Sequence, residues 1–354
     1  MARAGRHLIR KLGISLATLI VVVGGAELVC RAAGYAPRTD VIRWMAHPDL
    51  QALPMPSQRV WSGQDDPDSG RERICTTINR YSQRGLDYPL GKEPGELRVA
   101  IVGDSLTMGK GLDDADCFPQ LLRDLYAAQP PAGGAPRVIN AGINGWTSWH
   151  YMRWAETQLE VFQPDVLVIG LYLGNDMVPA FNAPLAIPVP MENALRGSAL
   201  YRFLVETYRA HLWKRIEATR RGKTVEELDA DLEAYMGKRE QDLTEEDQRV
   251  LWERNSLANI ERARDACRVH GVPLVCLMIP SYPMVLQPEP PAVYGFVRER
   301  LEQLEIPVVE CFEPIRAAGD GAWQEHDVGH LSALGCGIVA GILRDELARL
   351  GLVR

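Results

Sequence analysis

The chain has 354 residues, of which 46% are hydrophobic and 24% are charged, a composition typical of a globular protein. This length excludes a mini-domain that depends on disulfides, and it allows either two domains or one elaborated domain with an anchor. The formal net charge of −7, with no long basic stripe beyond the N-terminus, argues against a nucleic acid partner.

An apolar segment lies near the N-terminus. Leu12 to Cys30 approaches the roughly 20 residues that a helix needs to cross a bilayer. Basic residues precede it: Arg3, Arg6, Arg10 and Lys11. The positive-inside rule therefore places the N-terminus in the cytoplasm and the rest of the chain on the extracytoplasmic side. We predict that residues 1–31 are a basic tip and an uncleaved anchor, with Glu27 near its outer end, where a charge costs less.

Two other interpretations of this segment stay open. A cleaved secretory signal has a similar apolar region, and the small residues Ala32 and Ala33 follow it. A lipidated Cys30 is disfavoured, because Val29 stands where the lipoprotein pattern calls for a small residue. Residues 32–96 have little sustained periodicity, and from residue 37 on they are rich in Pro, Gly, Asp and Arg. They are predicted to be a connector that partly packs on the following domain.

From Leu97 onward, short apolar runs rich in β-branched residues alternate with helical patterns. The predicted strands are Arg98–Gly103, Val138–Ile139, Val166–Ile169, Leu274–Ile279 and Val308–Val309, and a helix is predicted over Pro119–Ala128. This alternation predicts an α/β fold with about five parallel strands, covered by helices on both faces. Ligands bind such sheets at the carboxyl ends of the strands.

A charged insertion over about residues 191–266 interrupts the alternation. Thr224–Glu227 and Thr244–Asp247 are predicted helix starts, the first with capping-box spacing, and Gly271 with Pro273 ends the second helix. The insertion is interpreted either as a lid or lateral cap, or as a solvated helical hairpin with no role in substrate choice.

Ser105 lies in Gly103-Asp104-Ser105-Leu106, directly after the first predicted strand. A serine there stands at the crevice, near the N–H groups that open the next helix, which suits a nucleophile. A helix cap is the alternative. A nucleophilic serine needs a base and a carboxylate that orients it, and Asp327-Val-Gly-His330 supplies both. Gly329 between them suits a tight loop.

Donors for an oxyanion are expected at two further strand ends. Gly142, in Asn140-Ala-Gly142-Ile-Asn-Gly145, allows close backbone approach after the second strand. Asn175, in Gly174-Asn175-Asp176, offers a side-chain amide after the third strand. Each segment alone is an ordinary turn, so only the set of four segments in this order points to a site.

This set resembles the SGNH, or GDSL, hydrolase superfamily over roughly residues 97–182 and 272–345. The resemblance implies a three-layer αβα sandwich of flavodoxin-like topology within a domain that we place at 97–354. It also implies Ser105 as nucleophile, His330 as general base and Asp327 as its partner. Ser105 N–H, Gly142 N–H and the Asn175 side chain would form the oxyanion hole. No cofactor is implied.

Parts of the sequence are also compatible with two alternatives to this chemistry. His326 and His330 have the spacing of a zinc-binding helix, with Glu346 as a third ligand, but Gly329 disfavours the helix. The seven cysteines are widely spaced without a C-x-x-C pair, so no cysteine metal site is expected, and disulfides stay unassigned. A non-catalytic carbohydrate-binding protein is the second alternative, suggested by the aromatic residues Trp146, Trp149, Tyr151 and Trp154.

The expected function is therefore a serine-dependent esterase or deacetylase that works through an acyl-enzyme. An O-acyltransferase would use the same residues with a sugar hydroxyl in place of water. An anchor followed by such a domain is similar to envelope members of the superfamily that handle O-acyl groups of polysaccharides. The expected partners are an acyl-ester substrate and the membrane.

Overall fold

The computed structural model describes residues 2–34, 42–62, 74–177, 244–325 and 327–354, and within 178–243 only 191, 195, 197–201, 203, 204 and 224. The first helix, α1 (Ala2–Ala32), contains one segment, Arg10–Ala32, that is long and apolar enough to cross a membrane. Such a segment suits a membrane anchor or a signal sequence. The uncleaved anchor therefore stays a prediction.

Glu27, the one acidic residue of this segment, is held by protein donors. Its carboxylate accepts hydrogen bonds from Ser198 Oγ at 2.7 Å and from the N–H groups of Ala199 and Leu200 at 3.0 and 2.9 Å. Arg31, one turn further along α1, forms an ion pair with it at 2.8 Å. The charge is thus satisfied within the protein.

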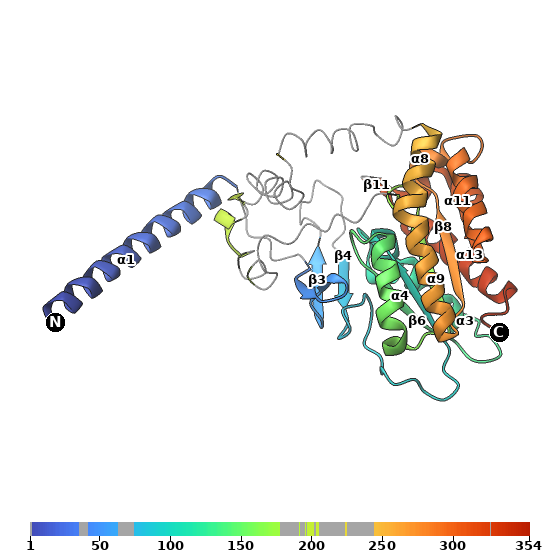
Figure 1. Cartoon of the computed structure of the whole chain (residues 1–354), viewed down its shortest axis with the longest axis horizontal. Coiled ribbons are helices and arrows are strands. Elements are labelled where there is room, and N and C mark those ends of the chain that lie inside the picture. The colour runs from blue at the N-terminus through green and yellow to red at the C-terminus, as the bar shows by residue number, and fades with distance from the viewer. Residues whose placement is uncertain are drawn as a thin grey trace. The chain divides into compact units, whose positions relative to one another are not determined.

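The chain divides into two compact units. A five-stranded parallel sheet is the centre of the unit whose described residues begin at Met45 (Figure 1). Its strands are β5 (Arg98–Gly103), β6 (Arg137–Gly142), β7 (Val166–Tyr172), β8 (Leu274–Ile279) and β9 (Val308–Glu310). The spatial order is β6-β5-β7-β8-β9, and all neighbours are parallel. The predicted five strands and α/β class are confirmed.

Helices cover both faces of this sheet, which gives three layers. The main ones are α3 (Phe118–Ala128), α4 (Ser148–Phe162), α9 (Ala258–His270), α11 (Ala292–Gln303) and α13 (Ala333–Arg349). Helix α3 packs against α13, and α4 lies beside α9, as Figure 1 shows. The helix predicted over Pro119–Ala128 is confirmed as α3.

The strand order reverses between β5 and β7, because the chain passes to β6 on one side of β5 and returns to β7 on the other. Ligands of doubly wound sheets bind at this reversal, beyond the carboxyl ends of the strands. All residues of β5 and β7 are buried, as expected for strands that are covered on both faces. Ser105 follows β5, and Asn175 follows β7.

The second predicted helix of the insertion is present. Thr244 forms a capping box with Asp247, and Gly271 ends the helix in the left-handed conformation at φ 66°. Between them, α8 (Glu245–Trp252), a π-helical turn and α9 follow one another without a break. The helix predicted to start at Thr224–Glu227 lies outside the described residues.

The predicted connector contains two strands and a segment that pairs with the edge of the sheet. Strands β3 (Gln58–Ser62) and β4 (Ile74–Ile78) pair antiparallel. Beyond β4, Arg84 bridges both Ile78 and Asn140, so this segment is tied to the edge strand β6. The remaining described elements are β1 (Trp44–His47), β2 (Gln51–Pro54), α2 (Ser105–Met108), α10 (Tyr282–Val285), α12 (Phe312–Ala318), β10 (Trp323–Gln324) and β11 (Asp327–Leu331).

Candidate active site

Ser105 is the first residue of α2, the short helix that begins where β5 ends. Asp104 caps this helix, because its Oδ1 accepts a hydrogen bond from the N–H of Leu106 at 2.9 Å. The turn is tight, and a Cβ at Gly103 would lie 2.0 Å from Thr107 Oγ1. Glycine at position 103 therefore allows α2 to fold closely against the strand end. Ser105 is buried, with 9% of its surface exposed.

His330 lies between Ser105 and Asp327 in an unbroken line of hydrogen bonds. Its Nε2 is 2.8 Å from Ser105 Oγ, and its Nδ1 is 2.8 Å from Asp327 Oδ2. In the neutral tautomer that fits both contacts, Nδ1–H donates to the carboxylate and the serine hydroxyl donates to Nε2. The three residues predicted from the sequence are thus brought together across 225 positions of the chain.

The segment that carries Asp327 and His330 differs from the predicted tight loop. Asp327–Leu331 is the strand β11, which pairs antiparallel with β10, and the pairing has an irregular register between Trp323 and Gln324. Gly329 N–H donates to Asp327 Oδ1 at 3.3 Å. This irregular hairpin lets two residues three positions apart meet, although a regular strand would direct them to opposite faces.

Asp327 has a cationic neighbour, Lys110, in addition to its contact with His330. Lys110 Nζ lies 3.3 Å from Asp327 Oδ2, in an ion pair whose side chains are about half exposed. Partial burial favours the neutral carboxyl, but the hydrogen bond from His330 and the positive charge of Lys110 outweigh it and lower the pKa of Asp327. Asp327 is therefore ionised at neutral pH, as an orienting carboxylate must be.

Asn175 is fixed by the capping carboxylate. Its Nδ2 donates to Asp104 Oδ2 at 3.2 Å. Burial raises the pKa of Asp104, while the N–H of Leu106 and the amide of Asn175 act in the opposite direction. One carboxyl group thus orients both α2, which begins at Ser105, and the side-chain amide predicted for the oxyanion hole.

The loop after β6 departs from the predicted oxyanion hole. Gly142 is buried, and its N–H donates to Asn140 Oδ1 at 3.0 Å, so this donor is already used within the protein. Gly145, three residues later, is exposed and has φ 80°. Among the described residues, its N–H has no protein acceptor. The pattern Asn-x-Gly, in which Asn turns onto the backbone two residues later, is the sequence signal for this arrangement.

Behind the site, Asp176 holds the turn that carries Asn175. Its carboxyl accepts hydrogen bonds from Tyr151 Oη at 2.9 Å and from the N–H of Tyr172 at 2.8 Å. Complete burial raises the pKa of Asp176 well above its ordinary value, and the nearby Asp104 adds to this rise. No pattern in the sequence predicts this role of Asp176.

The aromatic cluster is mainly a packing element. Trp146, Tyr151 and Trp154 are at most 4% exposed. The indole of Trp146 stacks on His150, with ring centroids 5.4 Å apart, and Trp154 stacks on Phe162. Buried rings offer no face to a sugar, so these three residues do not support the carbohydrate-binding alternative. Trp149 is partly exposed.

The zinc alternative required a helix across His326 and His330. Asp327–Leu331 forms a strand, and His326 lies outside the described residues. Glu346, the suggested third ligand, accepts a hydrogen bond from Arg349 Nε at 2.8 Å in α13. In the described part of the chain, no three His, Cys, Asp or Glu side chains form a group that would hold a metal ion. The seven cysteines are all described, buried and unpaired.

No family model and no curated protein matches the chain. The solved structures that match include the esterase EstA from Pseudoalteromonas sp., with 14% identity and a TM-score of 0.41 over 72% of this chain and 98% of that one. AlinE4, an SGNH-hydrolase family esterase, has 17% identity and a TM-score of 0.37 over 73% and 98%.

A third matching structure is a two-domain esterase active on acetylated mannans, with 15% identity and a TM-score of 0.42 over 72% of this chain and 50% of that one. All three of these matching structures are esterases, and AlinE4 is described as a member of the SGNH-hydrolase family. Because all these TM-scores lie below 0.5, the role of each residue here rests on its own contacts.

Proposed function

We propose that this protein is a serine-dependent carboxylic ester hydrolase with Ser105 as its nucleophile. The observation that carries the proposal is the line of two 2.8 Å contacts from Ser105 Oγ through the His330 ring to Asp327. A serine hydroxyl is a weak nucleophile until a base takes its proton, and an imidazole serves as that base when a carboxylate fixes its tautomer.

The reaction proceeds in two steps. Ser105 Oγ attacks the ester carbonyl while His330 Nε2 takes the hydroxyl proton, which gives a tetrahedral oxyanion. Collapse of this oxyanion breaks the bond to the leaving alcohol, which receives the proton from His330, and an acyl-enzyme remains. Water then adds with the same proton transfers and releases the acid. Asp327 stays ionised throughout and stabilises the imidazolium.

For the oxyanion hole, we propose a different set of donors from the sequence-based one. The N–H of Ser105 and the Asn175 amide are retained, and the amide is already oriented by Asp104 at 3.2 Å. Gly145 N–H replaces Gly142 N–H, because the latter donates to Asn140 while the former is exposed without a protein acceptor in the described chain. Donors that are fixed before the reaction stabilise the developing charge most effectively.

The narrower proposal for the substrate is an O-acetyl group on an envelope polysaccharide. It is supported by the N-terminal apolar helix and the basic residues before it, which favour a catalytic unit on the extracytoplasmic side. Transfer of the acyl group to a sugar hydroxyl uses the same residues. Hydrolysis and transfer differ only in which acceptor reaches the acyl-enzyme.

Incubation of the full-length protein with an aryl acetate and with acetylated polysaccharides, with and without acceptor sugars, tests these proposals. We expect acetate release that is lost in Ser105→Ala. Acetylated acceptor in place of free acetate would identify a transferase. If wild type and Ser105→Ala release acetate at the same rate from every substrate, Ser105 is not the nucleophile. Binding of polysaccharide without turnover would support the carbohydrate-binding alternative.

A further inference from the structure

The loop Gly109–Leu112 connects the two halves of the proposed site. It leaves the C-terminal end of α2, the helix that starts at Ser105. The N–H groups of Gly109 and Lys110 both donate to the carbonyl oxygen of Ser105, each at 2.9 Å. The start of the loop is therefore bound directly to the backbone of the nucleophile.

The same loop contacts the hairpin that carries the acid–base residues. Lys110 Nζ lies 3.3 Å from Asp327 Oδ2, and the Lys110 carbonyl accepts a hydrogen bond from Gln324 Nε2 at 2.7 Å. Gln324 Nε2 also donates to the carbonyl of Leu331 at 3.0 Å. Gly111 has φ 80°, and a Cβ there would lie 2.3 Å from Gln324 Oε1. Only glycine permits this close approach without displacement.

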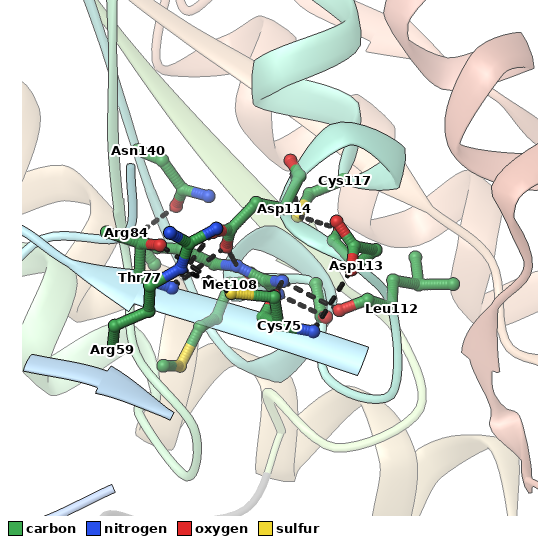
Figure 2. Close-up of polar contacts among 12 residues, drawn as sticks. Arg59, Cys75, Thr77, Arg84, Met108, Leu112, Asp113, Asp114, Cys117 and Asn140 are labelled. Atoms are coloured by element: carbon green, nitrogen blue, oxygen red, sulfur yellow. Dashed lines mark hydrogen bonds and ion pairs between the residues drawn. The ribbon is translucent and has the colours of Figure 1, made fainter. Parts of the chain in front are cut away.

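Arg84, from the segment predicted to be a connector, fixes the loop from its buried side (Figure 2). Its side chain is 1% exposed. One guanidinium nitrogen donates to the carbonyls of Met108, at 2.9 Å, and Gly109, while the other donates to the carbonyl of Leu112 at 2.7 Å. Both ends of the loop are thus held by a single side chain.

The guanidinium itself is held in place by groups outside the loop. Nε donates to Asp114 Oδ1 at 3.0 Å, and Nη2 donates to the carbonyl of Cys75 at 3.2 Å. Asp114 in turn accepts the N–H of Thr77 in β4 at 3.0 Å, as Figure 2 shows. A buried charge whose donors are satisfied in this way keeps one geometry, because any displacement leaves polar groups unpaired.

We propose that Arg84 and Lys110 are positioning residues for the ester chemistry. Arg84 locks the loop Gly109–Leu112, and through it the backbone of Ser105. Lys110 extends from this loop and holds the Asp327 carboxylate in the orientation that His330 requires. This inference rests on the proposed function, and it places the segment before the sheet within the catalytic apparatus.

Lys110→Met is the first test, because the side chain is half exposed and its removal leaves no buried charge unpaired. We expect kcat on an aryl acetate to fall about threefold to tenfold, with KM and Tm unchanged. The acid limb of kcat/KM should move to higher pH, because losing a cation beside Asp327 and His330 favours protonation of that pair. Asp104, which also interacts electrostatically with His330, is unchanged in this variant.

Ionic strength supplies a readout that a structural role would not move. An exposed ion pair is screened by salt, so in 1 M NaCl, where the screening length is about 3 Å, the acid limb of the wild type should approach that of the variant. The limb of Lys110→Met should shift less with salt. The matched control is Lys92→Met, which breaks the 2.6 Å pair of Lys92 with Asp165 away from the site.

Arg84→Lys tests whether the contacts of Arg84 with the loop Gly109–Leu112 matter for activity. Lysine keeps the charge beside Asp114 but loses the planar fork that reaches three carbonyls of α2 and the loop. We expect kcat to fall on the order of 10- to 100-fold with KM within about twofold, measured well below the Tm of the variant. Arg123→Met, which removes an arginine on α3 that pairs with Asp124, serves as the control.

The outcomes separate this inference from the proposed function. If Ser105→Ala is inactive while Lys110→Met and folded Arg84→Lys keep wild-type kcat and pH profile, the positioning roles are overturned and the proposed function stands. If Ser105→Ala is as active as the wild type, the proposed function is wrong, and the inference that rests on it is wrong as well. A fall in kcat in both positioning variants, with the predicted salt and pH behaviour in Lys110→Met, supports the inference.

Discussion

The two sides of the proposed site differ in burial. On the nucleophile side, Ser105 is 9% exposed and Asp104 is 1% exposed. On the acid–base side, the side chains of His330 and Asp327 are 13% and 42% exposed. Polar contacts around Ser105 therefore act in a low effective dielectric, whereas those around Asp327 are partly screened by water.

The two sides also differ in the strands that carry them. Ser105 follows β5, which pairs along most of its length with β6 and β7. Asp327 and His330 lie in β11, whose described strand partner is the two-residue strand β10. The sheet sets the position of Ser105, while individual side-chain contacts set the position of His330. Substitutions on the exposed side should therefore change activity with little loss of stability.

The largest expected effect is that of His330→Ala. Without its base, Ser105 keeps its hydroxyl proton, and kcat/KM should fall on the order of 10⁴- to 10⁶-fold while Tm changes little. Aryl acetate hydrolysis and thermal unfolding measure the two quantities. His270→Ala, at the end of α9, is the control. A fall below about tenfold would show that His330 is not the base.

Asp327→Asn should have the next largest effect. The amide retains the shape of the carboxylate but no longer favours the tautomer with the proton on Nδ1, so kcat should fall on the order of 10³- to 10⁴-fold. The unfolding free energy should change little, since the side chain is 42% exposed. An unchanged kcat would mean that the 2.8 Å contact with His330 does not orient the base.

Asn175→Ala tests the buried side. Removal of one oxyanion donor should lower kcat on the order of 10²- to 10³-fold with KM nearly constant. Asn259→Ala, which removes an amide that contacts Ser148 on α4 outside the site, is the matched control. Equal kcat in the wild type and Asn175→Ala would remove this amide from the oxyanion hole.

The contact between the two sides can be weakened at Gly111. Gly111 and Gly134 both have positive φ, at 80° and 90°, but only at Gly111 would a Cβ meet a neighbour, Gln324 Oε1. We expect Gly111→Ala to lower the unfolding free energy by about 1 kcal/mol more than Gly134→Ala, and also to lower kcat, because the displaced Gln324 amide loses its hydrogen bonds to the carbonyls of Lys110 and Leu331. Denaturant unfolding measures the difference. Equal losses in both variants would contradict the close contact.

The smallest predicted effect is a pH dependence of stability on the buried side. His150 caps the helix that follows Gly145, and its Nδ1 accepts the N–H of Thr147 at 3.1 Å. Burial lowers the pKa of His150 to about 4, against 6.5 when exposed. Between these values the unfolded chain takes up a proton that the folded chain does not, so this contribution to stability is lost as the pH falls.

The measurement for His150 is Tm from pH 7 to pH 4. His150→Gln should flatten the decline of Tm with falling pH, because glutamine has no proton to gain in this range. An identical decline in the wild type and His150→Gln would show that other groups cause it.

The sequence predicted the parts of the fold that follow from local pattern. The apolar run at Val99–Val102 indicated a strand covered on both faces, and the polar residues after such strands indicated the site, since all parallel strands end at one edge. Ser105, His330 and Asp327 meet as expected. Thr244 and Gly271 marked helix ends because capping depends on neighbouring residues only.

The contacts that were missed depend on long-range geometry. Lys110 and Asp327 are 217 positions apart, and no periodic pattern relates them. Arg84 stands in a segment without periodicity, where the sequence does not show that its side chain is buried. The contact of Gly142 is local instead, because its N–H donates to the side chain of Asn140. The Asn-x-Gly pattern is a sequence signal from which this contact could be predicted.

The central claim is that Ser105 is a nucleophile activated by His330. Labelling with a fluorophosphonate, followed by peptide mass spectrometry, tests it most directly. We expect one modified peptide, with the adduct on Ser105, and slow or no labelling in His330→Ala and Ser105→Ala. Labelling of Ser105→Ala at the wild-type rate, or an adduct on another residue, would contradict the claim.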